Sequence, residues 1–73
     1  MEYIINLMWD EKASVWIATS DGINGLVLES GSIDALIERV RFAIPELLEL
    51  NQNPIAETIS VCFRSERRER VYA

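Results

Sequence analysis

The chain has 73 residues and a formal net charge of −5; 49% of its residues are apolar and 26% are charged. This balance excludes a disordered polar segment and argues against general binding to nucleic-acid phosphates, which needs clustered cations. A domain of this size buries only about 60% of the surface of its unfolded chain, so we expect a homodimer or higher oligomer.

The first twenty residues predict a β-hairpin. Residues 2–9, EYIINLMW, are apolar on both faces of a strand, which is typical of an interior position in a sheet. A polar turn at 10–13 separates them from residues 14–20, which alternate with the period of two of a strand. Trp9 and Trp16 flank the turn, so we expect them to pack across the strands; a role as interface aromatics is the alternative.

A second turn at 21–25, DGING, contains Gly22 and Gly25 and leads into a third strand at 26–28. Gly25 lies where the loop re-enters a strand, so a backbone conformation closed to other residues is predicted there. Ser32 is the expected cap of a helix whose first turn carries Asp34, a carboxylate favoured by the helix dipole.

The helix shows one apolar stripe. Its members are Ile33, Leu36, Ile37, Val40, Ala43, Ile44 and Leu47. Pro45 predicts either a kink or a break, with a short second helix beginning at the proline. Residues 55–63 alternate as a fourth strand, in which the single cysteine, Cys62, is expected to be a buried structural thiol. The basic tail, residues 64–73, is expected to extend that strand or to fray.

The order of elements predicts a single α+β domain over residues 1–73. Three strands in a meander, a helix and a fourth strand parallel to the first give the sheet order 3-2-1-4, with the helix on one face. The opposite face then has nothing in the chain to cover it, although it carries apolar side chains. A partner protomer is the simplest cover.

These segments resemble the N-terminal domain of HicB-like antitoxins, especially a small standalone branch of that family. The likeness covers residues 4–50 and rests on two stretches, Ser20-Asp21-Gly22-Ile23-Asn24-Gly25 and Ser32-Ile33-Asp34-Ala35-Leu36. It also rests on four short segments that recur as a set, namely Trp9-Asp10, Val15-Trp16, Gly25-Leu26 and Pro45-Glu46-Leu47-Leu48.

The resemblance implies a partial RNase H-like fold and a place in a toxin–antitoxin pair, in which the domain covers the basic RNA-cutting surface of a small HicA-like toxin. The acids expected to attract such a partner are Asp10, Glu11, Asp21, Glu29, Asp34 and Glu38. Full-length HicB proteins usually add a DNA-binding domain, for which this chain has no room, so promoter autoregulation is not expected.

Catalysis is not expected. The chain has no histidine, and its acids do not converge as a two-metal nuclease site requires. No glycine-rich phosphate loop or metal-ligand spacing is present, so we expect neither metal nor cofactor. The chain has no run of about 20 apolar residues, the length that a transmembrane helix needs, and a cytoplasmic protein is expected.

The alternative function is a homo-oligomeric adaptor that binds a small ligand or RNA through its basic tail.

Overall fold

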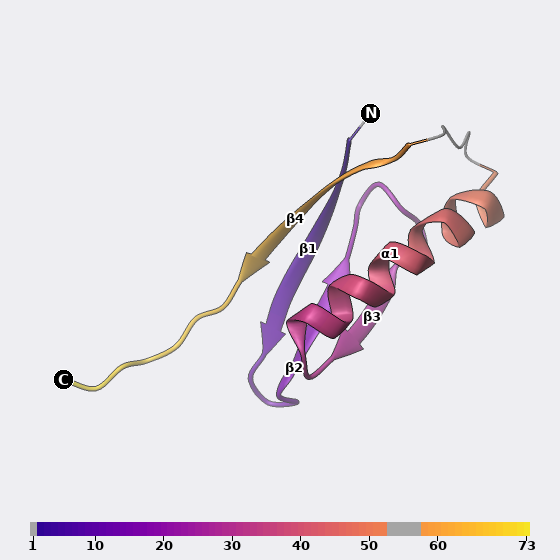
Figure 1. Ribbon diagram of the computed structural model, residues 1–73. Helices are drawn as coiled ribbons and strands as arrows, with labels where there is room; N and C mark the ends of the chain where they lie inside the picture. Colours follow the sequence, from indigo (N-terminus) through magenta and orange to yellow (C-terminus); the bar gives the residue numbers. More distant parts are fainter. Residues whose placement is uncertain (1, 53–57) are drawn as a thin grey trace.

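The computed structural model describes residues 2–52 and 58–73. One helix lies against one face of a four-stranded sheet, and the last residues run away from the body (Figure 1). The elements are β1 (Glu2–Asp10), β2 (Val15–Thr19), β3 (Val27–Ser30), α1 (Ile33–Leu50) and β4 (Ser60–Glu66).

The sheet has the order β3-β2-β1-β4. β1 pairs antiparallel with β2 and parallel with β4, while β2 pairs antiparallel with β3. This arrangement confirms the predicted α+β class and sheet order. It also makes β1 an interior strand, which explains why that strand is apolar on both faces.

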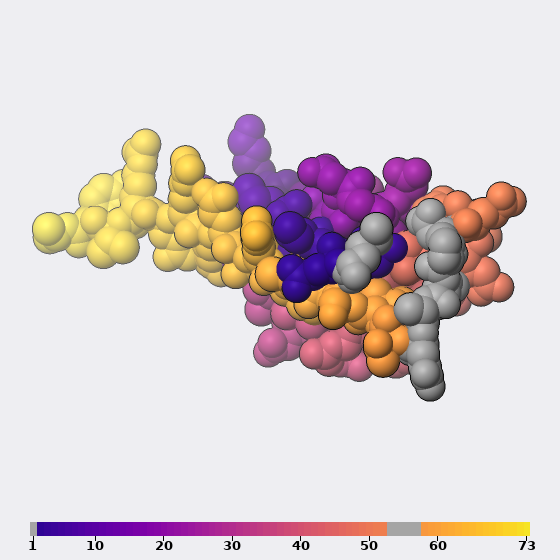
Figure 2. Space-filling model, turned by 90° about the horizontal axis from the view of Figure 1, so that it is seen from above, coloured from indigo at the N-terminus to yellow at the C-terminus, as the bar shows by residue number. Residues whose placement is uncertain are grey.

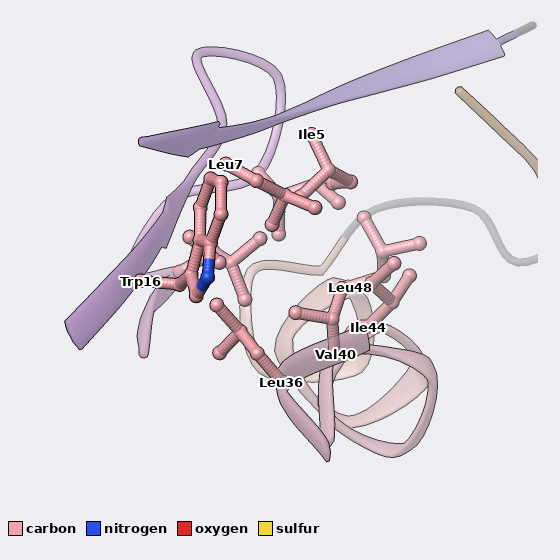
Figure 3. Close-up of a cluster of buried hydrophobic side chains, with 10 residues drawn as sticks. Ile5, Leu7, Trp16, Leu36, Val40, Ile44 and Leu48 are labelled. Carbon is pink, nitrogen blue, oxygen red and sulfur yellow. The ribbon is translucent and has the colours of Figure 1, made fainter. Parts of the chain in front are cut away.

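The core lies between α1 and the sheet. Alternate residues of the two central strands, Ile5 and Leu7 on β1 and Trp16 and Ala18 on β2, are buried on the face toward the helix. Figure 3 shows the sheet side chains directed at one stripe of α1. The buried residues of that stripe are Leu36, Val40, Ile44 and Leu48. Their spacing of four residues, close to the helical period of about 3.6, is what places all of them on one side of the helix.

β3 differs from its predicted bounds, whereas β4 extends into residues 64–66, which is one of the two predicted alternatives for the basic tail. β3 begins at Val27 and continues to Ser30, beyond the predicted end at residue 28. β4 continues to Glu66, although the apolar alternation ends at Phe63. Residues 64–66 are strand because Asn6, Leu7 and Met8 of β1 supply hydrogen-bonding partners for them. The predicted start of this strand at residue 55 lies outside the described residues.

Of the two alternatives predicted at Pro45, a kink or a break, the break is wrong. α1 is one continuous helix of 18 residues with Pro45 inside it, so no second helix begins there. Proline removes the bond that an amide at position 45 would donate to the carbonyl of Arg41. Ile44 and Leu48, on either side of the proline, are both buried in the same core, and their burial favours one uninterrupted helix direction over a break.

The predicted turn and cap residues have specific contacts. The Ser32 hydroxyl accepts a hydrogen bond of 3.3 Å from the amide of Ala35, which confirms the cap. Gly25 has φ +85°, the left-handed conformation predicted for it. Gly22 is constrained differently, because a Cβ atom there would lie 3.2 Å from Cδ1 of Tyr3. Its amide donates to the Ser20 hydroxyl, which donates in turn to the carbonyl of Ile4.

We expect Gly25→Val to lower the free energy of unfolding by about 1–3 kcal/mol, because a β-branched residue is strained at that φ. Urea denaturation measures the change. Gly31→Val is the matched control: the nearest atom to a Cβ at Gly31 is the Ser14 carbonyl oxygen at 4.0 Å, and no left-handed conformation is required there. Equal losses of stability in the two variants would contradict the prediction.

Candidate interaction surface

The sheet face turned away from α1 is called the outer face here. Since side chains alternate along a strand and paired residues point to the same side, the burial of Ile5, Leu7, Trp16 and Ala18 toward the helix fixes the residues of the other face. The outer-face positions are Glu2, Ile4, Asn6, Met8, Asp10, Val15, Ile17, Thr19, Val27, Glu29, Ser60, Cys62, Arg64 and Glu66. No described helix covers them.

The outer face is apolar at its centre and acidic around it. Ile4 and Ile17 lie on the two central strands and are half-buried, whereas Met8 is 47% exposed and Val27 is 70% exposed. The charged residues among these positions are Glu2, Asp10, Glu29, Glu66 and Arg64. Glu66 pairs with Arg68 at 3.2 Å, which leaves three carboxylates against one guanidinium. The face therefore has a negative potential, and its apolar centre is available for contact.

Two of the six predicted acids belong to the outer face. Glu29 lies on β3 opposite Ile17. Asp10 ends β1 and has a local role, since its Oδ1 atom accepts hydrogen bonds from the amides of Lys12 and Ala13 at 3.0 and 3.2 Å. Its carboxylate therefore shapes the β1–β2 turn, in addition to contributing charge.

The other four acids lie elsewhere. Glu11 is in the β1–β2 turn, and Asp34 is in the first turn of α1. Glu38 lies on the exposed side of α1 and pairs with Arg41 at 3.1 Å. Asp21 is in the β2–β3 loop, at the opposite end of β2 from the β1–β2 turn. The fold thus separates the predicted acids instead of gathering them into one patch.

Sequence reasoning missed Glu2 and Glu66 as members of the outer face. Both are exposed, and their positions follow from register: Glu2 pairs with Ser60, and Glu66 pairs with Met8. The alternation of β1 predicts the position of Glu2, because Glu2 is two residues before Ile4 and therefore lies on the same face of the strand. Glu66 could not be placed in the same way, since the polar residues after Phe63 do not show where the strand ends.

The two tryptophans confirm the predicted cross-strand packing. Trp9 lies directly opposite Trp16, with ring centroids 5.5 Å apart and planes at 60°. The Arg67 guanidinium lies over the Trp9 ring, 4.1 Å from its centroid, and Arg67 also pairs with Glu69 at 2.7 Å. Trp16 is buried, and Trp9 is half-buried beneath this cation. The alternative role as interface aromatics stays a prediction.

An apolar groove separates α1 from β4. α1 packs mainly against β2 and β3, so the helix-facing side chains of β4 are left partly uncovered. The groove has a volume of about 360 Å³ and is lined by Arg41, Ile44, Pro45, Ile59, Val61 and Phe63. It holds one charged side chain, so its chemistry suits an apolar occupant and not an ionic ligand.

Cys62 is not the buried thiol that was predicted. It pairs with Ile4 on the outer face and is only half-buried, because that face has no helix above it. Within the described residues, no group of three or more acids or cysteines is arranged to hold a metal ion. The described part of the chain likewise contains no helix of the length and apolarity that crossing a bilayer requires.

Comparison with known proteins supports the fold. The sequence matches the family described as "Domain of unknown function (DUF1902)" over residues 2–73. The structure is similar to the crystal structure of a hypothetical protein from the extremely thermophilic bacterium Thermus thermophilus, with a TM-score of 0.83 and 27% sequence identity. The similarity covers 97% of this chain and 100% of that one. No curated protein matches the chain. Neither description names a function, so the likeness to HicB-like antitoxins stays a hypothesis.

Arg67→Ala is expected to lower the free energy of unfolding by about 0.5–1 kcal/mol, through loss of the contact between the guanidinium and the Trp9 ring. Acrylamide should then quench tryptophan fluorescence more strongly, because the ring face becomes accessible. Arg64→Ala is the control, since it removes the same charge from the outer face, away from both rings. Unchanged quenching in Arg67→Ala would show that the cation does not cover the ring in solution.

Proposed function

The chain belongs to the DUF1902 family, and on that premise we propose that it is a non-enzymatic protein-interaction domain whose outer face binds a small basic protein. The proposal includes the HicB-like relationship, with its partial RNase H-like fold and its cytoplasmic setting. The partner class it names is the small HicA-like toxin.

The observation that carries this proposal is the composition of the outer face. Met8 and Val27 expose apolar surface on a sheet face that no described element covers. Exposed apolar surface of this kind, surrounded by mainly acidic residues, marks protein interaction sites. Glu2 and Glu29 supply that charge, so the complementary surface is basic with an apolar centre.

The sequence resemblance supplies the class of partner. The loop at 20–25 and the helix start at 32–36 are the segments that resemble HicB-like antitoxins, and both adjoin β3, which carries Val27 and Glu29 of the outer face. In the antitoxin family this domain covers a basic toxin surface. A negatively charged outer face in this chain agrees with such a partner.

The second candidate, a homo-oligomeric adaptor that binds RNA or a small ligand through the basic tail, has less support. Two of the tail's guanidinium groups have carboxylate partners within the chain: Arg67 pairs with Glu69 at 2.7 Å, and Arg68 pairs with Glu66 at 3.2 Å. Cations paired in this way contribute less to phosphate binding than free ones do. We therefore favour the protein partner.

The test is charge reversal on the outer face. Glu2→Lys combined with Glu29→Lys is expected to slow association with a purified HicA-like toxin by about tenfold, because long-range attraction by these carboxylates raises the association rate. Surface plasmon resonance at two salt concentrations measures the effect. Wild-type association should weaken as added salt shortens the Debye length below about 8 Å, and the variant should depend less on salt.

Glu46→Lys combined with Glu49→Lys is the matched control. It makes the same change in net charge on exposed positions of α1, on the other side of the sheet. A slower association in this control equal to that of the outer-face variant would contradict the assignment of the surface. If the wild-type chain binds no HicA-like toxin and captures no small basic protein from cells that contain it, the function itself is wrong.

A further inference from the structure

The part of the basic tail beyond β4, residues 67–73, continues the direction of that strand past the sheet (Figure 1). From here on, the word tail means residues 67–73 only. Figure 2 shows this segment extending away from the body of the molecule. The tail pairs with no described strand, although it carries two large apolar side chains. Val71 is 89% exposed and Tyr72 is 90% exposed. An isolated extended segment with side chains of this kind lacks the contacts that would offset the entropy of ordering it.

Two ion pairs where the tail leaves β4 join side chains that lie on the same side of the chain, as they would in a continuing strand. Arg68 pairs with Glu66, and Arg67 pairs with Glu69, so each ion pair joins residues two positions apart. Residues two apart lie on one side of an extended chain. The Arg67 contact with Trp9 lies on the α1 side of the sheet, so Arg67 continues the alternation of β4 at the start of the tail.

β4 has a free edge next to this segment. β1 is its only strand partner in the described chain, so the hydrogen-bonding groups on its other edge are unpaired there. β4 is seven residues long, whereas β3 at the opposite edge has four. Short edge strands resist pairing with other chains, and long ones favour it. The apolar groove lies along the same strand, with Val61 and Phe63 partly uncovered.

We propose that two copies of this chain associate through their β4 edges, with the tail of each copy paired antiparallel to β4 of the other. The occupant of the free edge is thus the tail of a second copy. The result is one continuous eight-stranded sheet with both helices on the same side. This inference does not depend on the proposed function, because the outer face remains open in such a dimer.

Symmetry limits the possible registers. Two identical antiparallel strands are related by a two-fold axis normal to the sheet, which places one residue opposite its own copy. An axis at Glu66 would oppose the two Glu66 side chains and would set Arg64 against Arg68, both like-charge pairs. An axis at Arg67 opposes the two Arg67 side chains, but it also sets Glu66 against Arg68, a favourable pair that occurs twice and that the Glu66 axis lacks.

The axis at Arg67 also matches the apolar residues. It places Val71 opposite Phe63 on the α1 side, where Val71 adds to the open flank of the groove. It places Tyr72 opposite Cys62 on the outer face. Its unfavourable pairs are Arg67 with its own copy and Arg64 with Arg70. An axis at Ser65 would pair Arg64 with Glu66 but would set the charged residues 67–69 opposite residues 61–63, so the apolar pairs decide for the Arg67 register.

Analytical ultracentrifugation between 1 and 100 μM tests the dimer. The wild-type chain is expected to sediment with twice its 8.4 kDa monomer mass. Val71→Asp combined with Tyr72→Asp should weaken self-association at least tenfold, because both side chains then lose apolar partners. The same variant should keep the wild-type melting profile at low concentration, because the tail makes few contacts within its own chain.

Phe42→Asp is the matched control: Phe42 is 73% exposed on α1 and does not line the groove. Self-association of this variant should equal that of the wild type. A wild-type monomer throughout the concentration range would overturn the proposal. So would a dimer that survives the tail substitutions, or one that dissociates only on Phe42→Asp.

Disulfide trapping tests the register. Tyr72→Cys places a thiol opposite Cys62 of the other copy. Directly opposed Cβ atoms in a sheet are about 4.5–5.5 Å apart, and a disulfide needs about 3.5–4.5 Å, so a small shift of the strands allows the bond. With oxidised glutathione this variant should give a covalent dimer on non-reducing gels. Val71→Cys is the control, because position 71 faces the α1 side while Cys62 lies on the outer face. Equal trapping in both variants, or none in Tyr72→Cys, would overturn the register.

Discussion

A single helix cannot cover both faces of a four-stranded sheet, and the rest of this structure follows from that limit. α1 packs mainly against β2 and β3, and its stripe from Leu36 to Leu48 closes the core over the inner face. The core is compact because Ile23 and Leu26, from the β2–β3 loop, are also buried with it. Within the described residues, the outer face and the groove beside β4 remain uncovered.

These two uncovered regions differ in chemistry, and so they suit different partners. The outer face combines exposed Met8 and Val27 with carboxylates, which favours a basic protein. The groove and the free edge of β4 combine unpaired backbone groups with Val61 and Phe63, which favours another strand. Because they lie on different sides of the sheet, a dimer formed at the edge leaves the outer face free for a second protein.

The Trp9–Trp16 pair connects the core to the tail. Trp16 is part of the buried cluster, and Trp9 lies against it at the end of the β1–β2 hairpin. The Arg67 guanidinium lies over the Trp9 ring, one residue beyond the end of β4. The tryptophan pair is therefore in contact with the first residue of the segment that we assign to self-association.

The sequence alone determined the elements whose signals are local. The period of two in β1 and β2, the Ser32 cap and the left-handed Gly25 were predicted correctly, because each depends on a few neighbouring residues. The sheet order was also predictable, since three strands, a helix and a strand allow one economical topology.

Only the tertiary structure decided the features that depend on partners distant in sequence. β4 extends to Glu66 because β1 provides a hydrogen-bonding edge, and α1 runs through Pro45 because residues on both sides of it enter one core. Register with the other strands placed Glu2, Glu29 and Glu66 on one face and left Asp21 and Asp34 away from it. No local pattern contains this information, because a one-residue shift in pairing would move every side chain of a strand to the opposite face.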